Sequence, residues 1–268
     1  MAAPRIDHLV LGVASLEQAG ADFRNSGFDV LDRGDAAGPM QNRLVRFADG
    51  SFLELLAFSG DSMHRFAPRW IKGSGWIDFA LNASDFSRQT EALRAATGRD
   101  LPRRSLSKHA PTVGKSWELD LIEPGVGAFD PVLPFLIEEK TPTDWRLPPL
   151  GGDIRQPHGI SGVRGVTCVT DDLERSKTLL TAMFGKPAAI SSRHGAGTIA
   201  VLFEDERIWV ELVQPINSAT AIGTHIQKYG TGLYEATLLG SEVIESLPAA
   251  ARHRAKLRVS SVDGFPFP

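Results

Sequence analysis

The apolar positions in the first part of the chain change their spacing from one segment to the next. Residues 6–13, IDHLVLGV, form an apolar, β-branched run that predicts a strand. In residues 14–27, Leu16, Ala19 and Phe23 fall on one helical face, with Ser15 as an N-cap and Gly27 as a stop. This segment is therefore predicted to be an amphipathic helix.

Three further strands follow the helix, at residues 28–34, 42–48 and 51–58. The last two are separated by Asp49-Gly50, a dipeptide typical of a hairpin turn. The predicted order is therefore β-α-β-β-β.

The same order returns later in the chain, beginning at residues 76–98 and at residues 163–185. Aligning the helix starts of the first and third copies places Gly165 at the position of His8, and Glu211 then matches Glu54. A shortened fourth copy begins at residues 232–247. The stretches 59–75 and 138–162 are interpreted as linkers, and repetition of this kind predicts a modular architecture.

Two polar residues open the first strand. Period-two alternation predicts that Asp7 and His8 lie on opposite faces, one of them with Val10. His8 is either the polar end of an edge strand or one ligand of a metal site.

Alternation in residues 51–58 places Glu54 on the same face as Phe52 and Leu56. A carboxylate in apolar surroundings is costly unless an ion or a partner compensates it. The candidates are a metal ion shared with His8 and a salt bridge to Arg46.

Composition limits the function classes. The chain has 268 residues, a net charge of −3 and one cysteine. We find no basic stripe with aromatics, no signal peptide and no apolar run long enough to cross a membrane. The expectation is a cytoplasmic protein that binds a small molecule, with no nucleic-acid or membrane partner. Its oligomeric state is left open, with a homodimer as one form.

The stretches IDHLVLGVASLEQAGADFRNSGFDV and QNRLVRFADGSFLELLAF resemble the first module of glyoxalase-like proteins of the vicinal oxygen chelate superfamily. The resemblance implies an α+β fold in which βαβββ modules pair into half-open mixed-sheet cups. We expect one domain over residues 1–150, with the metal site, and a second, degenerate module pair over 158–268. Because Gly165 replaces the first-strand ligand, the second pair is expected to lack a metal.

Within this resemblance, His8 and Glu54 are the expected metal ligands. Their nitrogen and oxygen suit Fe, Mn, Ni, Co or Zn better than Ca²⁺. Asp78 aligns with His8 in the second copy and is the expected third ligand, although relatives more often have His, Gln or Glu there. A polar edge residue is the alternative for Asp78. The last strand of that copy has Leu136 at its centre, which leaves the fourth ligand open.

Three residues are expected to bind substrate. Gln41 and Asn42 precede the third strand, where Asn42 either contacts substrate or forms an Asx-turn. His158, in a Pro-His-Gly sequence, partly matches a relatives' motif and either closes over the cup or lies in an exposed loop.

The leading functional hypothesis is a divalent-metal-dependent isomerase or lyase that chelates a small oxygenated metabolite through two oxygens. The alternatives are a metal-free protein that sequesters a small ligand and an extradiol-type dioxygenase. The dioxygenase becomes plausible again if His158 closes over the metal.

Overall fold

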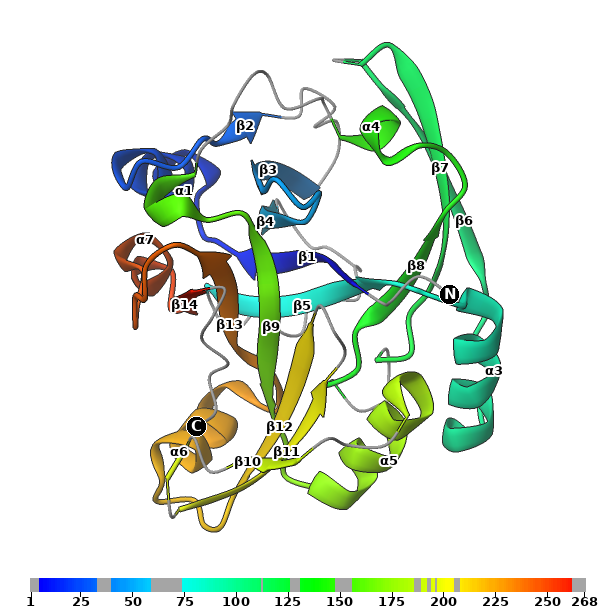
Figure 1. Ribbon diagram of the computed structural model, residues 1–268, viewed down its shortest axis with the longest axis vertical. Coiled ribbons are helices and arrows are strands. Elements are labelled where there is room, and N and C mark those ends of the chain that lie inside the picture. The colour runs from blue at the N-terminus through cyan, green and yellow to red at the C-terminus, as the bar shows by residue number, and fades with distance from the viewer. Residues whose placement is uncertain are drawn as a thin grey trace.

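Two curled β-sheets form the body of the protein in the computed structural model (Figure 1). The structure describes residues 5–32, 40–58, 74–111, 113–125, 131–147, 156–185, 189–191, 194–195, 197–204 and 208–261. The expected linker at 59–75 lies almost entirely outside these ranges.

The first sheet has eight strands in the order β2-β3-β4-β1-β5-β8-β7-β6. Their bounds are β1 Arg5–Gly12, β2 Leu31–Asp32, β3 Met40–Arg46, β4 Phe52–Phe58, β5 Gly75–Asn82, β6 Arg104–Ala110, β7 Lys115–Ile122 and β8 Phe135–Glu139.

The second sheet has six strands in the order β10-β11-β12-β9-β13-β14. Their bounds are β9 Gly162–Val169, β10 Ala189–Ser191, β11 Thr198–Glu204, β12 Trp209–Pro215, β13 Gly232–Gly240 and β14 Lys256–Ser261.

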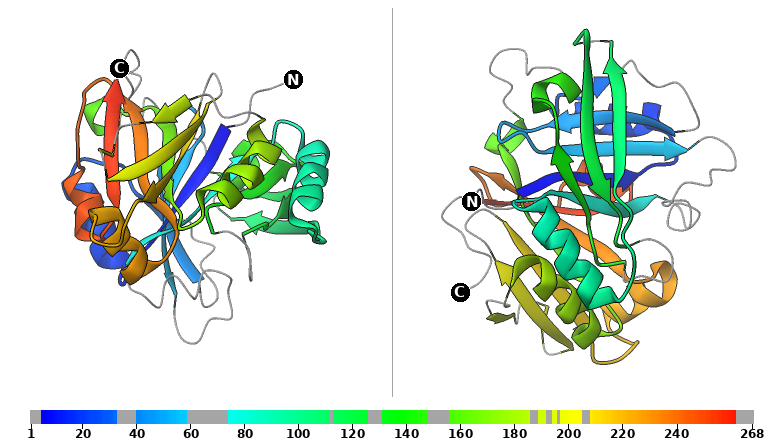
Figure 2. Two further views of the ribbon diagram at one scale, coloured as in Figure 1. Left: turned by 90° about the horizontal axis from the view of Figure 1, so that it is seen from below. Right: turned by 90° about the vertical axis from the view of Figure 1, so that its right-hand side faces the viewer.

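The helices connect and cover these strands (Figure 2). Their bounds are α1 Leu16–Asn25, α3 Phe86–Thr97, α4 Thr143–Arg146, α5 Leu173–Phe184, α6 Ala221–Tyr229, α7 Pro248–Arg252 and the short 3-10 turn η1 Pro157–Gly159.

The module repeat is visible in the helix starts. The side chains of Ser15, Asp85 and Asp172 each accept a hydrogen bond from the backbone N–H three residues further on, at the start of α1, α3 and α5. Such an N-cap satisfies one of the free N–H groups of the first turn. The predicted cap at Ser15 is therefore confirmed.

Strand pairing joins the modules into cups. β1 pairs parallel with β4 of its own module and antiparallel with β5, the first strand of the next module. In the second sheet β9 pairs with β12 and β13 in the same two ways. The α+β fold of paired βαβββ modules is confirmed, with the fourth module reduced to β13, α7 and β14.

One large apolar cluster lies between the sheets and their helices. It includes Leu9 and Leu53 from the first sheet, Val166 and Leu212 from the second, and Phe23 from α1. The other face of the first sheet has its own apolar clusters. The division into domains at 1–150 and 158–268 stays a prediction, because the core is shared and residues 148–155 lie outside the described ranges.

Several elements differ from the sequence expectations. β6, α6 and β14 were not predicted, and the third strand begins at Met40, so that Gln41 and Asn42 lie within it. The expected linker at 138–162 contains α4. Within the described ranges, no helix has the length and apolarity to cross a membrane.

Candidate functional site

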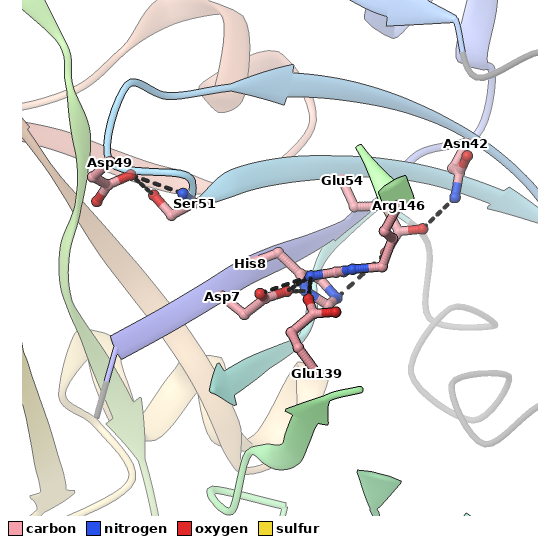
Figure 3. A network of polar contacts seen from close by, with 8 residues as sticks. All are labelled: Asp7, His8, Asn42, Asp49, Ser51, Glu54, Glu139 and Arg146. Atoms are coloured by element: carbon pink, nitrogen blue, oxygen red, sulfur yellow. Dashed lines mark hydrogen bonds and ion pairs between the residues drawn. The ribbon is translucent and has the colours of Figure 1, made fainter. Parts of the chain in front are cut away.

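The candidate site lies on the cup face of the first sheet, where β1 and β4 run side by side (Figure 3). His8 is opposite Phe52, and their rings stack with centroids 4.5 Å apart. The ring of Phe135 contacts His8 edge-on from the other side, at 5.2 Å. His8 is therefore held between two aromatic side chains and is only 7% exposed.

A β-bulge brings Asp7 into the site. The β1–β5 register shifts between Ile6 and His8, so Asp7 has no partner residue on β5. A bulge breaks the strict alternation of side chains, and Asp7 Oδ2 lies 2.7 Å from His8 Nδ1. The prediction that Asp7 and His8 point to opposite faces was wrong for this reason.

Arg146 determines the charge of Asp7. Its Nη2 donates to both oxygens of Asp7, at 2.9 and 3.1 Å, and to Glu139 Oε1 at 2.5 Å. Burial raises the pKa of Asp7, but the charge of Arg146 and the hydrogen bond to His8 outweigh it, and the pKa falls well below its usual range. The ionised Asp7 can only accept hydrogen bonds, so it accepts the Nδ1–H of His8, and the ring directs Nε2 toward Glu54.

Glu54 completes the polar cluster. Its Oε2 lies 3.7 Å from His8 Nε2, and its Oε1 accepts a hydrogen bond from Asn42 Nδ2 at 2.5 Å. The alternative salt bridge to Arg46 does not form. The structure therefore brings together His8, Glu54 and Asn42 among the residues expected from the sequence.

The described contacts do not join the other expected residues to this cluster. Asp78 nevertheless shares its face, because Val10 is opposite both Glu54 on β4 and Asp78 on β5, and Asp78 Oδ1 accepts the N–H of Phe79 at 2.8 Å. Gln41 is exposed, and strand alternation directs it away from the face of Asn42. His158 Nδ1 lies 2.8 Å from Glu242 Oε2. Substrate or metal roles for these residues stay predictions.

Sequence reasoning missed Arg146 and Glu139. Arg146 belongs to the short helix α4 in a stretch that reads as a proline-rich linker, and its burial follows from packing that no periodicity signals. Glu139 did have a signal, because it alternates with Phe135 and Ile137 on β8. Burial raises the pKa of Glu139, and Arg146 only partly offsets this effect.

Helix α4 covers this end of the cup. Leu147, which follows it, packs with Leu44 and Phe52, and Trp145 contacts the apolar cluster of the cup. The Arg146 guanidinium lies over the Phe52 ring, 5.6 Å from its centroid. These contacts hold Arg146 in place beside Asp7 and shield the ion pair from water.

The corresponding position of the second sheet is filled. A Cβ on Gly165 would lie 2.2 Å from the Trp209 ring. Glu211, the counterpart of Glu54, is fully buried and lies 2.9 Å from both His194 Nε2 and Thr167 Oγ1. The Trp209 ring thus fills the space beside Gly165, and His194 and Thr167 already bind the carboxylate of Glu211.

The described residues contain no group of three His, Cys, Asp or Glu side chains arranged to hold a metal ion. The pair His8 and Glu54 fits a metal ion as two of its ligands. Their facing atoms are 3.7 Å apart, and typical metal–ligand distances of about 2.0–2.2 Å would let one ion contact both.

Comparison with solved structures shows the same fold in other proteins. A mutant 4-hydroxymandelate synthase from Streptomyces coelicolor superposes with a TM-score of 0.66 at 15% identity, over 93% of this chain and 78% of the other. A xylose isomerase-like TIM barrel/4-hydroxyphenylpyruvate dioxygenase fusion protein gives 0.51 at 14% identity, over 92% of this chain and 41% of the fusion.

No curated protein matches the sequence. The family model for the glyoxalase-like domain matches residues 6–184, which is more than half of the chain and includes His8, Glu54 and Arg146. The chain belongs to the glyoxalase-like domain family of the vicinal oxygen chelate superfamily.

Proposed function

We propose that the protein is a divalent-metal-dependent enzyme of the isomerase or lyase type. Its substrate is a small oxygenated metabolite that chelates the ion through two neighbouring oxygens. The observation that carries this proposal is the pair His8 Nε2 and Glu54 Oε2, which face each other at 3.7 Å on the cup face. His8 and Glu54 are the proposed protein ligands, and Asp78 stays a proposed third.

The contacts around the pair support a ligand role. Asp7 accepts the Nδ1–H of His8, the arrangement that commonly fixes the tautomer of a metal-bound histidine. Asn42 binds the second oxygen of Glu54 and so orients Oε2 toward His8. An imidazole and a carboxylate together suit Fe, Mn, Ni, Co or Zn.

A bound ion would polarise a substrate carbonyl or hydroxyl and stabilise negative charge on its oxygen. The apolar wall of the cup, formed by residues such as Val10, Leu56 and Trp117, keeps water from the reacting group. A low-dielectric wall strengthens the attraction between the developing charge and the cation.

The proposal is tested by the metal content of the protein purified without added metal. We expect about one transition-metal ion per chain, and its loss in His8→Ala and Glu54→Gln. His109→Ala and Glu118→Gln remove the same groups from exposed positions and serve as matched controls. No bound metal after loading, or unchanged metal in both site variants, would overturn the proposal.

A metal-free binding protein is the second candidate. It is favoured by the lack of a three-ligand group among the described residues and by Arg146, which supplies the positive charge beside Asp7 and Glu139. Binding of a small ligand by protein that takes up no metal would favour it. The extradiol alternative has less support, because His158 lies beside Glu242 and structural likeness at 14–15% identity carries the fold alone.

A further inference from the structure

Arg46, the last residue of β3, is a buried arginine that has no counterion among the described residues. It is 7% exposed, and its Nε and Nη1 have no hydrogen-bond partner in the part of the chain that the structure describes. No carboxylate among the described residues lies within ion-pair distance of it. Burial, and next the like charge of Arg146, lower its pKa.

The position of Arg46 places it at the candidate site. Strand alternation puts it on the same face as Leu44, which packs against Phe52, and Asn42, which binds Glu54. Across the sheet, Arg46 pairs with Phe52, and Phe52 pairs with His8. Because neighbouring strands are about 4.8 Å apart, the backbones of Arg46 and His8 are separated by about 10 Å.

The two arginines of the site differ in their charge balance. Arg146 is paired with both Asp7 and Glu139 and so serves the protein's own carboxylates. Among the described residues, Arg46 has only the like charge of Arg146 nearby, and an unpaired charge in an apolar environment costs several kcal/mol. A ligand that carries a negative charge would remove this cost, and a guanidinium matches the paired oxygens of a carboxylate or phosphate.

We propose that Arg46 binds an anionic group, a carboxylate or a phosphate, of a substrate whose neighbouring oxygens reach His8 and Glu54. This inference rests on the proposed function, because it names the substrate class for the same cup. It makes Arg46 a specificity determinant that selects small oxygenated acids over neutral compounds of the same shape.

Binding of three probes to the protein as purified tests the inference, with calorimetry and ligand-induced thermal shift as the measurements. Glycolate carries a carboxylate beside a hydroxyl, glycolamide is its neutral counterpart, and inorganic phosphate is the second anion. We expect an anion to bind more tightly than glycolamide by about tenfold or more. Preference for glycolate identifies a carboxylate, and preference for phosphate identifies a phosphate.

Substitutions test whether Arg46 causes the preference for an anion over glycolamide. Arg46→Met should lower the affinity for the preferred anion by about ten- to a hundredfold. Arg46→Lys keeps the positive charge but loses the paired N–H donors of the guanidinium, and should lower the affinity by less. Arg104→Met, at an exposed arginine paired with Glu123, changes the net charge equally and should have no effect. Equal binding of glycolamide and both anions would overturn the inference without any variant, as would anion binding unchanged in Arg46→Met.

The metal content of the same samples separates this inference from the proposed function. Arg46-dependent anion binding by protein that takes up no metal would refute the metal-dependent enzyme and leave the anion site standing. A metal-loaded protein with no anion preference would refute the anion site alone.

Discussion

Asp7 and His8 are neighbours on one strand, yet their side chains bind each other, with Oδ2 and Nδ1 2.7 Å apart. A regular strand would direct them to opposite faces, and the β-bulge before His8 removes that constraint. Asp7 thereby connects His8 to Arg146, so the guanidinium on α4 and the imidazole on β1 bind the same carboxylate.

The two buried arginines are predicted to affect stability in opposite ways. Arg146→Met leaves Asp7 and Glu139 without their counterion and should lower the free energy of unfolding by about 3–5 kcal/mol. Arg46→Met removes an unpaired charge and should leave that free energy unchanged or raise it. Denaturant unfolding of both variants measures the difference, and equal losses would contradict it.

Asn42 is predicted to position Glu54 for metal binding. Asn42→Ala removes the hydrogen bond to Glu54 Oε1 and should weaken metal affinity by about ten- to a hundredfold, while the fold is kept. Gln41→Ala, at the exposed neighbouring position, is the matched control. Titration with metal under chelator competition distinguishes them, and equal affinities would show that Glu54 needs no such support.

Gly165 is predicted to be intolerant of any side chain. In Gly165→Ala the new Cβ meets the Trp209 ring, and the resulting shift should cost about 1–3 kcal/mol of unfolding free energy. The same change in a Trp209→Leu background should cost less, because the ring is gone. A double-mutant cycle measures this coupling, and additive effects would mean that another contact excludes the side chain.

His225 is predicted to make stability pH-dependent. Burial, and next the charge of Lys256, lower its pKa to about 4, while its ring contacts Tyr229 and Tyr234. The unfolded chain takes up a proton near pH 6.5 and the folded chain only near pH 4, so stability falls as the pH drops through this window.

The loss should be on the order of 2 kcal/mol after allowance for solvent screening. Denaturant unfolding at several pH values should show a smaller slope for His225→Phe than for the parent. His109→Gln, at an exposed histidine, should keep the parent slope. A parent-like slope in His225→Phe would assign the pH dependence to other groups.

Local signals in the sequence were sufficient for the module repeat and for part of the site. Ser15, the Asp49-Gly50 turn and the alternation of Phe52, Glu54 and Leu56 each act within a few residues and predict one conformation. They also placed His8 and Glu54 within predicted strands, while the expectation that both residues belong to one site came from the family resemblance.

The remainder of the site depends on contacts between distant segments. The bulge that turns Asp7 toward His8 is set by pairing with β5, and Arg146 is buried because α4 folds over a strand more than a hundred residues earlier. Neither effect has a periodic signal. Gly165 was aligned with His8, and the two residues do occupy equivalent strand positions, but the ring of Trp209 that lies against Gly165 depends on the register of β12 with β9.

The core shared between the two sheets makes the order of synthesis matter. The ribosome releases the first sheet before the second exists, so Leu9, Leu53 and their neighbours face water until β9 to β14 have been made. Apolar surface exposed in this interval is prone to aggregation. The first cup, which contains the candidate site, is therefore fully stabilised only after the last part of the chain has been translated.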